Sequence, residues 1–229
     1  MNSYNPSIPV INLDVDSRSR FISRTYGHLL GAMVLFTLIE MYFFTSGLAP
    51  RIASGLMSVS WLLVLGGFVV VSWLATRAAH LAQSKGVQYL ALAGFVVAQS
   101  IIFVPLLLIA QLRAQGVIQS AALVTLIGFG ALTALVFWSR QDFSFLRTVL
   151  AWGGIIALLL IVAGAIFGFN LGMFFSVAMI ALAGGAILYD TSNVLHHYPE
   201  DRYVGASLQL FASVAMMFWY VLRLFLSRR

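Results

Sequence analysis

The sequence contains no cysteine and very little charge. Its 229 residues are 61% hydrophobic and 9% charged, whereas a soluble domain carries roughly 25% charged residues. The lack of cysteine excludes disulfides, zinc–thiolate sites, iron–sulfur clusters and cysteine nucleophiles. One small core cannot hide this much apolar surface, so lipid must cover part of it. We therefore expect an integral membrane protein.

Motifs of known catalytic and cofactor chemistry are also absent. The chain has no HExxH, no GxSxG and no glycine-rich phosphate loop. Its single lysine, Lys85, is expected in a loop, which excludes a retinal Schiff base. The histidines are expected at a helix start or in loops, where no facing pair can hold haem: His28, His80, His196 and His197. We predict neither an enzyme nor a bound cofactor.

Long apolar runs are abundant. A membrane-spanning helix needs about 20 apolar residues, and seven runs meet this length: 25–47, 53–75, 87–110, 117–138, 148–168, 171–195 and 204–225. The breaks between them are short and polar, so neighbouring helices should be antiparallel. We predict an all-α bundle of seven transmembrane helices over residues 21–229, preceded by a polar tail over residues 1–20. The first run is too long for the apolar region of a signal peptide, and we expect no cleavage.

Arginine and lysine residues predict the orientation of the bundle. Eight of them fall on the side of the membrane that holds the N-terminus, and five fall on the other side. This excess predicts a cytoplasmic N-terminus, although Arg223, Arg228 and Arg229 at the opposite end argue the other way. The net charge of +6 follows from these loop arginines, and no basic cluster interleaved with aromatic residues indicates nucleic-acid binding.

Small residues are concentrated late in the chain. Glycine and alanine recur between residues 153 and 186, and small side chains let membrane helices approach closely. We therefore expect the helices at 148–168 and 171–195 to lie in the centre of the bundle.

Two of the seven acidic residues, Glu40 and Asp190, lie inside predicted spans. A charge near the bilayer centre costs about 2.5–3.5 kcal/mol, so such groups usually face a cavity or a partner. Asp190 is about five residues, roughly 7 Å, from the end of its span. Helical spacing places it on one face with Asn193, and a stripe on the last span carries Gln209 and Ser213. A short hinge joins these two spans. We therefore predict that one hydrogen-bonded patch is formed by Asp190, Asn193, Gln209 and Ser213.

Each acid has two interpretations. Asp190 is either a buried acid that neighbouring donors hold to fix the helix register, or a gate that responds to protons or cations. Burial and hydrogen-bond donors shift the pKa of a carboxyl group in opposite directions, so an acid among helices can change charge near neutral pH. Glu40 either lies in a water-filled outer vestibule or extends outward to the membrane surface.

Three motifs, in this order along the chain, resemble the transmembrane Bax-inhibitor-motif family. FISRTYGHLLGAM at 21–33 resembles the opening of its first helix, and DFSFL at 142–146 resembles its fourth-to-fifth loop. LYDTSNVLH at 188–196, followed by LQLF, resembles its most specific signature. The resemblance covers essentially the whole chain and implies a seven-helix bundle with the last helix near the centre. It also implies calcium leak or cation homeostasis, gated by pH through two aspartates, of which the first maps onto Asp190.

The chain departs from this family pattern at the second aspartate. That position is Ser213 here, and the acid often found four residues earlier is Gln209. Two close carboxylates share a proton, whereas a single carboxylate that faces serine and glutamine cannot. An arginine expected in the second span is also missing, since residues 53–75 carry no charge.

The serine and the TSN after Asp190 are similar to the bacterial branch of the family, which implies a bacterial inner (plasma) membrane. Members of that branch are linked to a membrane-anchored AAA protease of the FtsH type, as modulators or slowly degraded clients. The tail over residues 1–20 fits a handle for such a protease, or is ordinary disorder at a terminus. Two functions stay open: a cation leak, with calcium as the implied ion, gated around Asp190, and a regulator that transports nothing.

Overall fold

The computed structural model describes residues 8–227, and these are almost entirely helical. Seven helices are long and apolar enough to cross a membrane: α1 (Val15–Thr45), α3 (Trp61–Leu81), α4 (Lys85–Arg113), α5 (Val117–Ser139), α6 (Leu146–Phe167), α7 (Gly172–His196) and α8 (Tyr203–Ser227). A short helix, α2 (Ala49–Met57), and two 3-10 turns, η1 (Val10–Asn12) and η2 (Glu200–Arg202), complete the described chain. The predicted seven-helix membrane bundle is confirmed.

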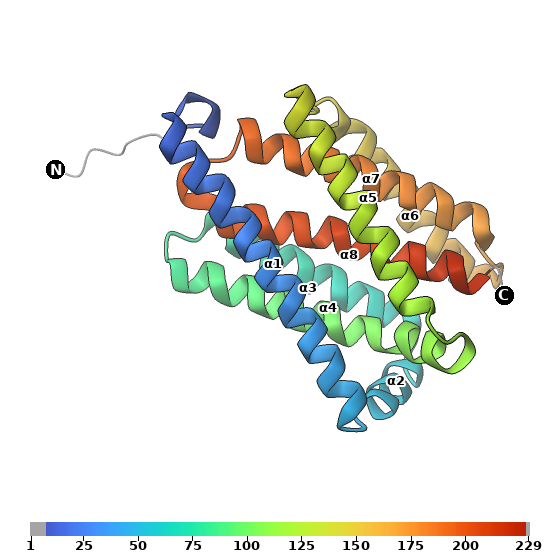
Figure 1. The fold of residues 1–229 in the computed structure, drawn as a ribbon. Coiled ribbons are helices and arrows are strands. Elements are labelled where there is room, and N and C mark those ends of the chain that lie inside the picture. Colours follow the sequence, from blue (N-terminus) through green and yellow to red (C-terminus); the bar gives the residue numbers. More distant parts are fainter. Residues whose placement is uncertain (1–7, 228–229) are drawn as a thin grey trace.

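The last helix, α8, lies in the middle of the bundle, as the family resemblance implied (Figure 1). It packs against α1, α3, α4, α5 and α7. Consecutive long helices run in opposite directions, so the two ends of the described chain lie at opposite ends of the bundle. We call the end with the starts of α1, α4, α6 and α8 the N-terminal face, and the other end the C-terminal face.

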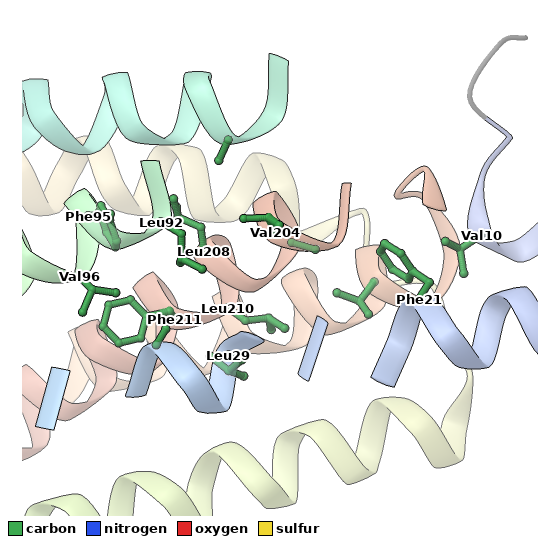
Figure 2. Close-up of a cluster of buried hydrophobic side chains, with 14 residues drawn as sticks. Val10, Phe21, Leu29, Leu92, Phe95, Val96, Val204, Leu208, Leu210 and Phe211 are labelled. Atoms are coloured by element: carbon green, nitrogen blue, oxygen red, sulfur yellow. The ribbon is translucent and has the colours of Figure 1, made fainter. Parts of the chain in front are cut away.

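The two largest core clusters share α8. One cluster joins α1, α4, α7 and α8 towards the N-terminal face, and Figure 2 labels ten of its side chains: Val10, Phe21, Leu29, Leu92, Phe95, Val96, Val204, Leu208, Leu210 and Phe211. A second cluster lies closer to the C-terminal face and includes the fully buried Phe103 and Leu222. Because α8 contributes to both, its position depends on all the helices around it.

The predicted span at 53–75 is two helices rather than one. Residues 49–57 form α2, which begins with Pro50 in its first turn, a favourable position for proline. Ala49 and Ala53 pack α2 against Val104 of α4, so the short helix lies across the C-terminal face. The membrane-spanning helix α3 starts only at Trp61.

The first helix begins ten residues earlier than the apolar run that predicted it. Asp14 caps α1, because its Oδ2 accepts a hydrogen bond from the backbone N–H of Ser17 at 3.0 Å. The predicted boundary between tail and membrane domain, at residue 20, therefore falls inside α1. Residues 1–7 of the predicted tail, and the C-terminal Arg228 and Arg229, lie outside the described residues.

The prediction that the helices at 148–168 and 171–195 are both central is wrong for the first of them. The buried residue of α6 is Ala157, and α6 packs mainly on α7. Gly153 allows this contact, since a Cβ atom there would lie 2.6 Å from Leu182. Gly154 beside it meets no neighbouring atom within 4 Å. Small residues thus permit one close approach in α6 without making the helix central.

Candidate functional site

Asp190 lies at the interface between α7 and α8. It is 2% exposed, and its Oδ2 accepts a hydrogen bond from the Ser213 hydroxyl at 2.5 Å. α7 continues for six residues to His196, which places Asp190 roughly 9 Å inside the end of the helix. Ala183 and Ile187, on the same face of α7, are fully buried. The carboxyl group therefore faces α8 and not the lipid.

Only half of the predicted four-residue patch is formed. Among residues 8–227, no hydrogen bond joins the side chain of Asn193 or Gln209 to Asp190. The carbonyl oxygen of Asn193 accepts hydrogen bonds from the backbone N–H groups of His197 at 2.8 Å and Tyr198 at 3.1 Å, which end α7. Gln209 lies beside the imidazole of His80. The site around Asp190 is thus a pair rather than a patch.

His80, which the sequence placed in a loop, belongs to the last turn of α3 and packs on the α7–α8 connection. Its ring stacks on that of Tyr198, with the centroids 5.7 Å apart. Gly205 allows this approach, because a Cβ atom there would lie 2.6 Å from Nδ1 of His80. Arg202 donates a hydrogen bond to the carbonyl oxygen of Ala82 at 2.7 Å. The end of α3 is therefore fastened to the α7–α8 connection.

The first described residues fasten the same connection from the other side. The backbone N–H of Val10 donates to the carbonyl oxygen of Tyr198 at 2.9 Å, and Pro9 pairs with Pro199 as an isolated β-bridge. Val10 is fully buried and lies beside Phe21 (Figure 2). Burial of a valine side chain contributes about 1.5–3 kcal/mol. We call residues 9–12, with their contacts to Tyr198 and Pro199, the N-terminal clasp.

Tyr198 connects this junction electrostatically with Asp190. Burial, and after it the nearby charge of Asp190, raise the pKa of the Tyr198 phenol above its ordinary value. The phenol is therefore neutral at physiological pH. The ring of His80 stacks on that of Tyr198, and the charged Arg202 lies close enough to interact with it electrostatically. Of these three side chains, Tyr198 is the one that interacts with the charge of Asp190.

The α5–α6 loop is held against α7 close to the site. The hydroxyl oxygen of Ser192 accepts a hydrogen bond from the backbone N–H of Phe143 at 2.9 Å. Oδ2 of Asp142 lies 3.1 Å from Nε2 of His197. Partial desolvation raises the pKa of Asp142, but hydrogen bonds from Ser144 and the charge of His197 outweigh it and lower the pKa below its ordinary value. The DFSFL motif at 142–146 thus supplies the contact between this loop and α7.

Three hydroxyl groups near the site were not identified from the sequence. Tyr26 on α1 faces Thr133 on α5 and Thr191 on α7. None of these hydroxyls has a hydrogen-bond partner within the described part of the chain. Thr191 directly follows Asp190, so the cluster lies one helical position from the acid. The sequence did single out the FISRTYGHLLGAM motif, which contains Tyr26. Only the fold shows that Tyr26 lies beside α7.

Glu40 faces a cleft near the C-terminal face. It is 7% exposed, and neither of its carboxyl oxygens has a hydrogen-bond partner among residues 8–227. The cleft has a volume of about 520 Å³ and is lined by residues of α1, α4, α5 and α8. The alternative in which Glu40 extends to the membrane surface is therefore wrong, because the side chain points into the bundle.

The two buried acids lie on opposite sides of α8. Asp190 contacts α8 through Ser213. The residues of α8 that line the cleft of Glu40 are Phe211, Val214, Ala215 and Phe218. At about 100° per residue, their stripe faces away from Ser213. The cleft that Glu40 faces therefore does not include Asp190.

Acidic and histidine side chains do not cluster at either acid. Within residues 8–227, no group of three or more His, Asp or Glu side chains is placed to hold a metal ion. Ca²⁺ takes roughly six to eight oxygen ligands, and each acid stands alone among the acidic side chains of the described chain.

Comparisons with known proteins agree with the motifs. Residues 18–229 match the model of the family described as "Inhibitor of apoptosis-promoting Bax1". The chain is 30% identical to a BI1-like protein of Arabidopsis thaliana over 217 residues, which are 89% of this chain and 79% of the relative. It is 33% identical over 95 residues to two Escherichia coli proteins, named Modulator of FtsH protease YccA and Inner membrane protein YccA, covering 41% of this chain and 43% of each relative.

Proposed function

This chain belongs to the Bax inhibitor-1-like family of membrane proteins, and from that premise we propose that it is a slow cation leak, calcium included, whose opening depends on Asp190. The observation that carries the proposal is the buried pair of Asp190 and Ser213 between α7 and the central helix α8. Protein surrounds the carboxyl group of Asp190, which is 2% exposed, and in this proposal the described conformation is the closed one. An ion reaches it only after α8 moves away from α7.

A single acid in the gate gives a single titration step. When Asp190 takes up a proton, one of its oxygens changes from an acceptor into a donor, and the group loses one unit of charge. The Ser213 hydroxyl, which donates to the carboxylate, can then accept a hydrogen bond from the protonated acid. Two neighbouring carboxylates would release their protons in two separate steps, but serine occupies the second position here.

The test is calcium flux through vesicles that contain the full chain and a calcium-sensitive dye. We expect wild-type flux to differ between pH 6 and pH 8, and Asp190→Asn to lose that difference. Asp16→Asn is the matched control, because it removes an exposed acid at the start of α1 on the same face of the bundle, and it should behave as wild type. Flux no greater than that of empty vesicles at both pH values would overturn the proposal.

A second function, as modulator or slowly degraded client of a membrane-anchored protease, is favoured by separate observations. One relative is named a modulator of FtsH protease, and another is named an inner membrane protein. We propose that this chain also lies in a bacterial inner membrane, with its N-terminus in the cytoplasm. The tail ahead of α1 leads directly into the N-terminal clasp. A protease that pulls on residues 1–8 therefore pulls on the junction beside Asp190, and the clasp resists extraction.

Degradation by a purified FtsH-type protease with ATP tests this second function. Deletion of residues 1–7 removes the handle and should lengthen the half-life of the chain. Val10→Asp keeps the handle but disrupts the buried contact of the clasp, and it should shorten the half-life. Equal half-lives of wild type and both variants would contradict the handle and the clasp, whatever the outcome of the flux experiment.

A further inference from the structure

The cleft at Glu40 takes no part in the proposed gate, and its polar lining gathers at one end. Glu40 stands five residues before the end of α1, and Gln111 stands two before the end of α4. Gln119 stands two residues after the start of α5. These three helix ends meet at the C-terminal face. The mouth of the cleft is therefore polar and close to the membrane surface.

The deeper lining of the same cleft is apolar. Phe36 and Met33 follow Glu40 inward along α1. Phe36 packs edge-on against Phe211 of α8, with the ring centroids 6.1 Å apart. At 1.5 Å per residue, Met33 lies about 10 Å deeper than Glu40. The cleft thus has a polar mouth and an apolar floor.

The two threonine hydroxyls in the cleft already have partners. The hydroxyl of Thr37 donates to the carbonyl oxygen of Met33 at 2.9 Å. The hydroxyl of Thr125 donates to the carbonyl oxygen of Ala121 at 2.8 Å. Glu40 differs, because it is more than nine-tenths buried and both of its oxygens lack a partner among the described residues.

We propose that this cleft binds a lipid of the surrounding bilayer by its primary ammonium head group, with the ammonium on Glu40 and one acyl chain along the apolar floor. A buried carboxyl group without a partner is costly. Within residues 8–227, no lysine or arginine forms an ion pair with Glu40. A primary ammonium group supplies both the opposite charge and three hydrogen-bond donors.

The size and surroundings of the cleft favour a lipid over a free amine. Its volume of about 520 Å³ lies within the range of ligand pockets, roughly 300–1,000 Å³. Met41 and Leu126 on its rims are exposed, so the cleft opens towards hydrocarbon, from which an acyl chain can enter. Arg113, exposed in the last turn of α4 at the same face, suits the phosphate that accompanies the ammonium group.

Native mass spectrometry of the full chain tests the site. The protein is released from nanodiscs that contain equal amounts of phosphatidylethanolamine, phosphatidylcholine and phosphatidylglycerol. We expect one retained phosphatidylethanolamine, enriched about tenfold over phosphatidylglycerol, the factor that one charge-assisted hydrogen bond provides. Phosphatidylcholine should be retained less than phosphatidylethanolamine, because its methylated ammonium has no N–H donor.

Variants separate the head-group site from the chain site. Glu40→Gln should lose the enrichment, and Ala122→Trp, which fills the cleft lining, should lower retention of every lipid. Asp16→Asn is the matched control, because it removes an exposed acid at the other end of the same helix and should retain lipid as wild type does. A monodisperse size-exclusion peak and an unchanged melting temperature show that each variant is folded.

Equal retention of the three lipids by the wild type would overturn the proposal, and so would an unchanged preference in Glu40→Gln. Loss of the bound lipid on addition of EDTA would also overturn it, since a metal ion would then bridge Glu40 and the phosphate. Because Glu40 and Asp190 lie on opposite sides of α8, failure of the flux experiment leaves this result unaffected.

Discussion

The hydroxyl group of Ser213 donates a hydrogen bond to Oδ2 of Asp190 at 2.5 Å, and both residues are buried. This contact joins the central helix α8 to α7. In the family pattern that the sequence resembles, the position of Ser213 carries an aspartate. An aspartate at this position would bring a second carboxyl group close to that of Asp190. Two carboxyl groups so close share a proton.

Ser213→Asp should divide the pH dependence of calcium flux into two steps. Two carboxyl groups so close repel each other when both are charged, so we expect their protons to leave one after the other. Flux through vesicles at closely spaced pH values between 4 and 9 resolves the steps. Ser213→Ala is the control, because it removes the donor without adding an acid, and it should keep a single step. A single step in Ser213→Asp at the same pH as in the wild type would contradict the coupling.

Gly205→Ala should destabilise the bundle by about 1–3 kcal/mol, because the added atom overpacks a close contact. A Cβ atom there would lie 2.6 Å from Nδ1 of His80 and 3.0 Å from the backbone oxygen of Ala79, and the backbone cannot rotate away. Gly27→Ala is the matched control, since a Cβ atom at Gly27 in α1 meets no atom within 4 Å. Thermal unfolding of both variants in one detergent provides the comparison, and equal melting temperatures would disprove the close packing of α3 on α8.

Val10→Ala should loosen the N-terminal clasp. The substitution removes two buried methyl groups, which stabilise the contact by about 1–2 kcal/mol. Hydrogen exchange should become faster in residues 197–205, where the clasp binds, and stay unchanged in α4. Ile11→Ala is the control, because Ile11 is 49% exposed. If exchange responds equally to both substitutions, Val10 does not hold the α7–α8 connection.

The contact between Asp142 and His197 should be sensitive to acid. A carboxyl group whose pKa is lowered by folding stabilises the folded state above its ordinary pKa, and this stabilisation is lost as the pH falls through the lowered value. The loop contact should therefore persist above about pH 3.8 and weaken below it. Because both side chains are more than a third exposed, the effect is small, about 0.2–1 kcal/mol.

Hydrogen exchange of residues 140–146 at pH 5 and pH 3 measures this loss. In Asp142→Asn, the loop should exchange equally fast, relative to an unstructured peptide, at both pH values. A wild-type loop whose protection does not change between them would contradict the prediction.

Sequence reasoning predicted the spans well because hydropathy is a property of each segment by itself. It misplaced two boundaries where other factors decide. Residues 49–57 are apolar enough to extend the next span, but packing of Ala53 on Val104 lays them across the end of the bundle. Residues 15–20 are polar but helical, because the Asp14 cap and the residues that follow continue α1 beyond the apolar run.

The candidate site was predicted in part. Asp190 was identified because charged residues are rare in apolar runs. Helical spacing and the short hinge then predicted that its helix, α7, meets α8 at this residue. The partner itself, Ser213 rather than Gln209 or Asn193, depends on how α8 is rotated about its axis. That rotation is set by contacts with five other helices, and a local pattern does not contain it.

The sequence by itself determined that the chain enters a membrane as seven helices, and that two carboxyl groups enter with it, because insertion depends on the apolar character of each segment. Only the tertiary structure decided that one carboxyl group accepts a hydrogen bond from a serine and that the other faces a cleft between α1, α4, α5 and α8. The physical reason is packing in lipid, where close fit between helices, and not hydropathy, chooses which faces meet.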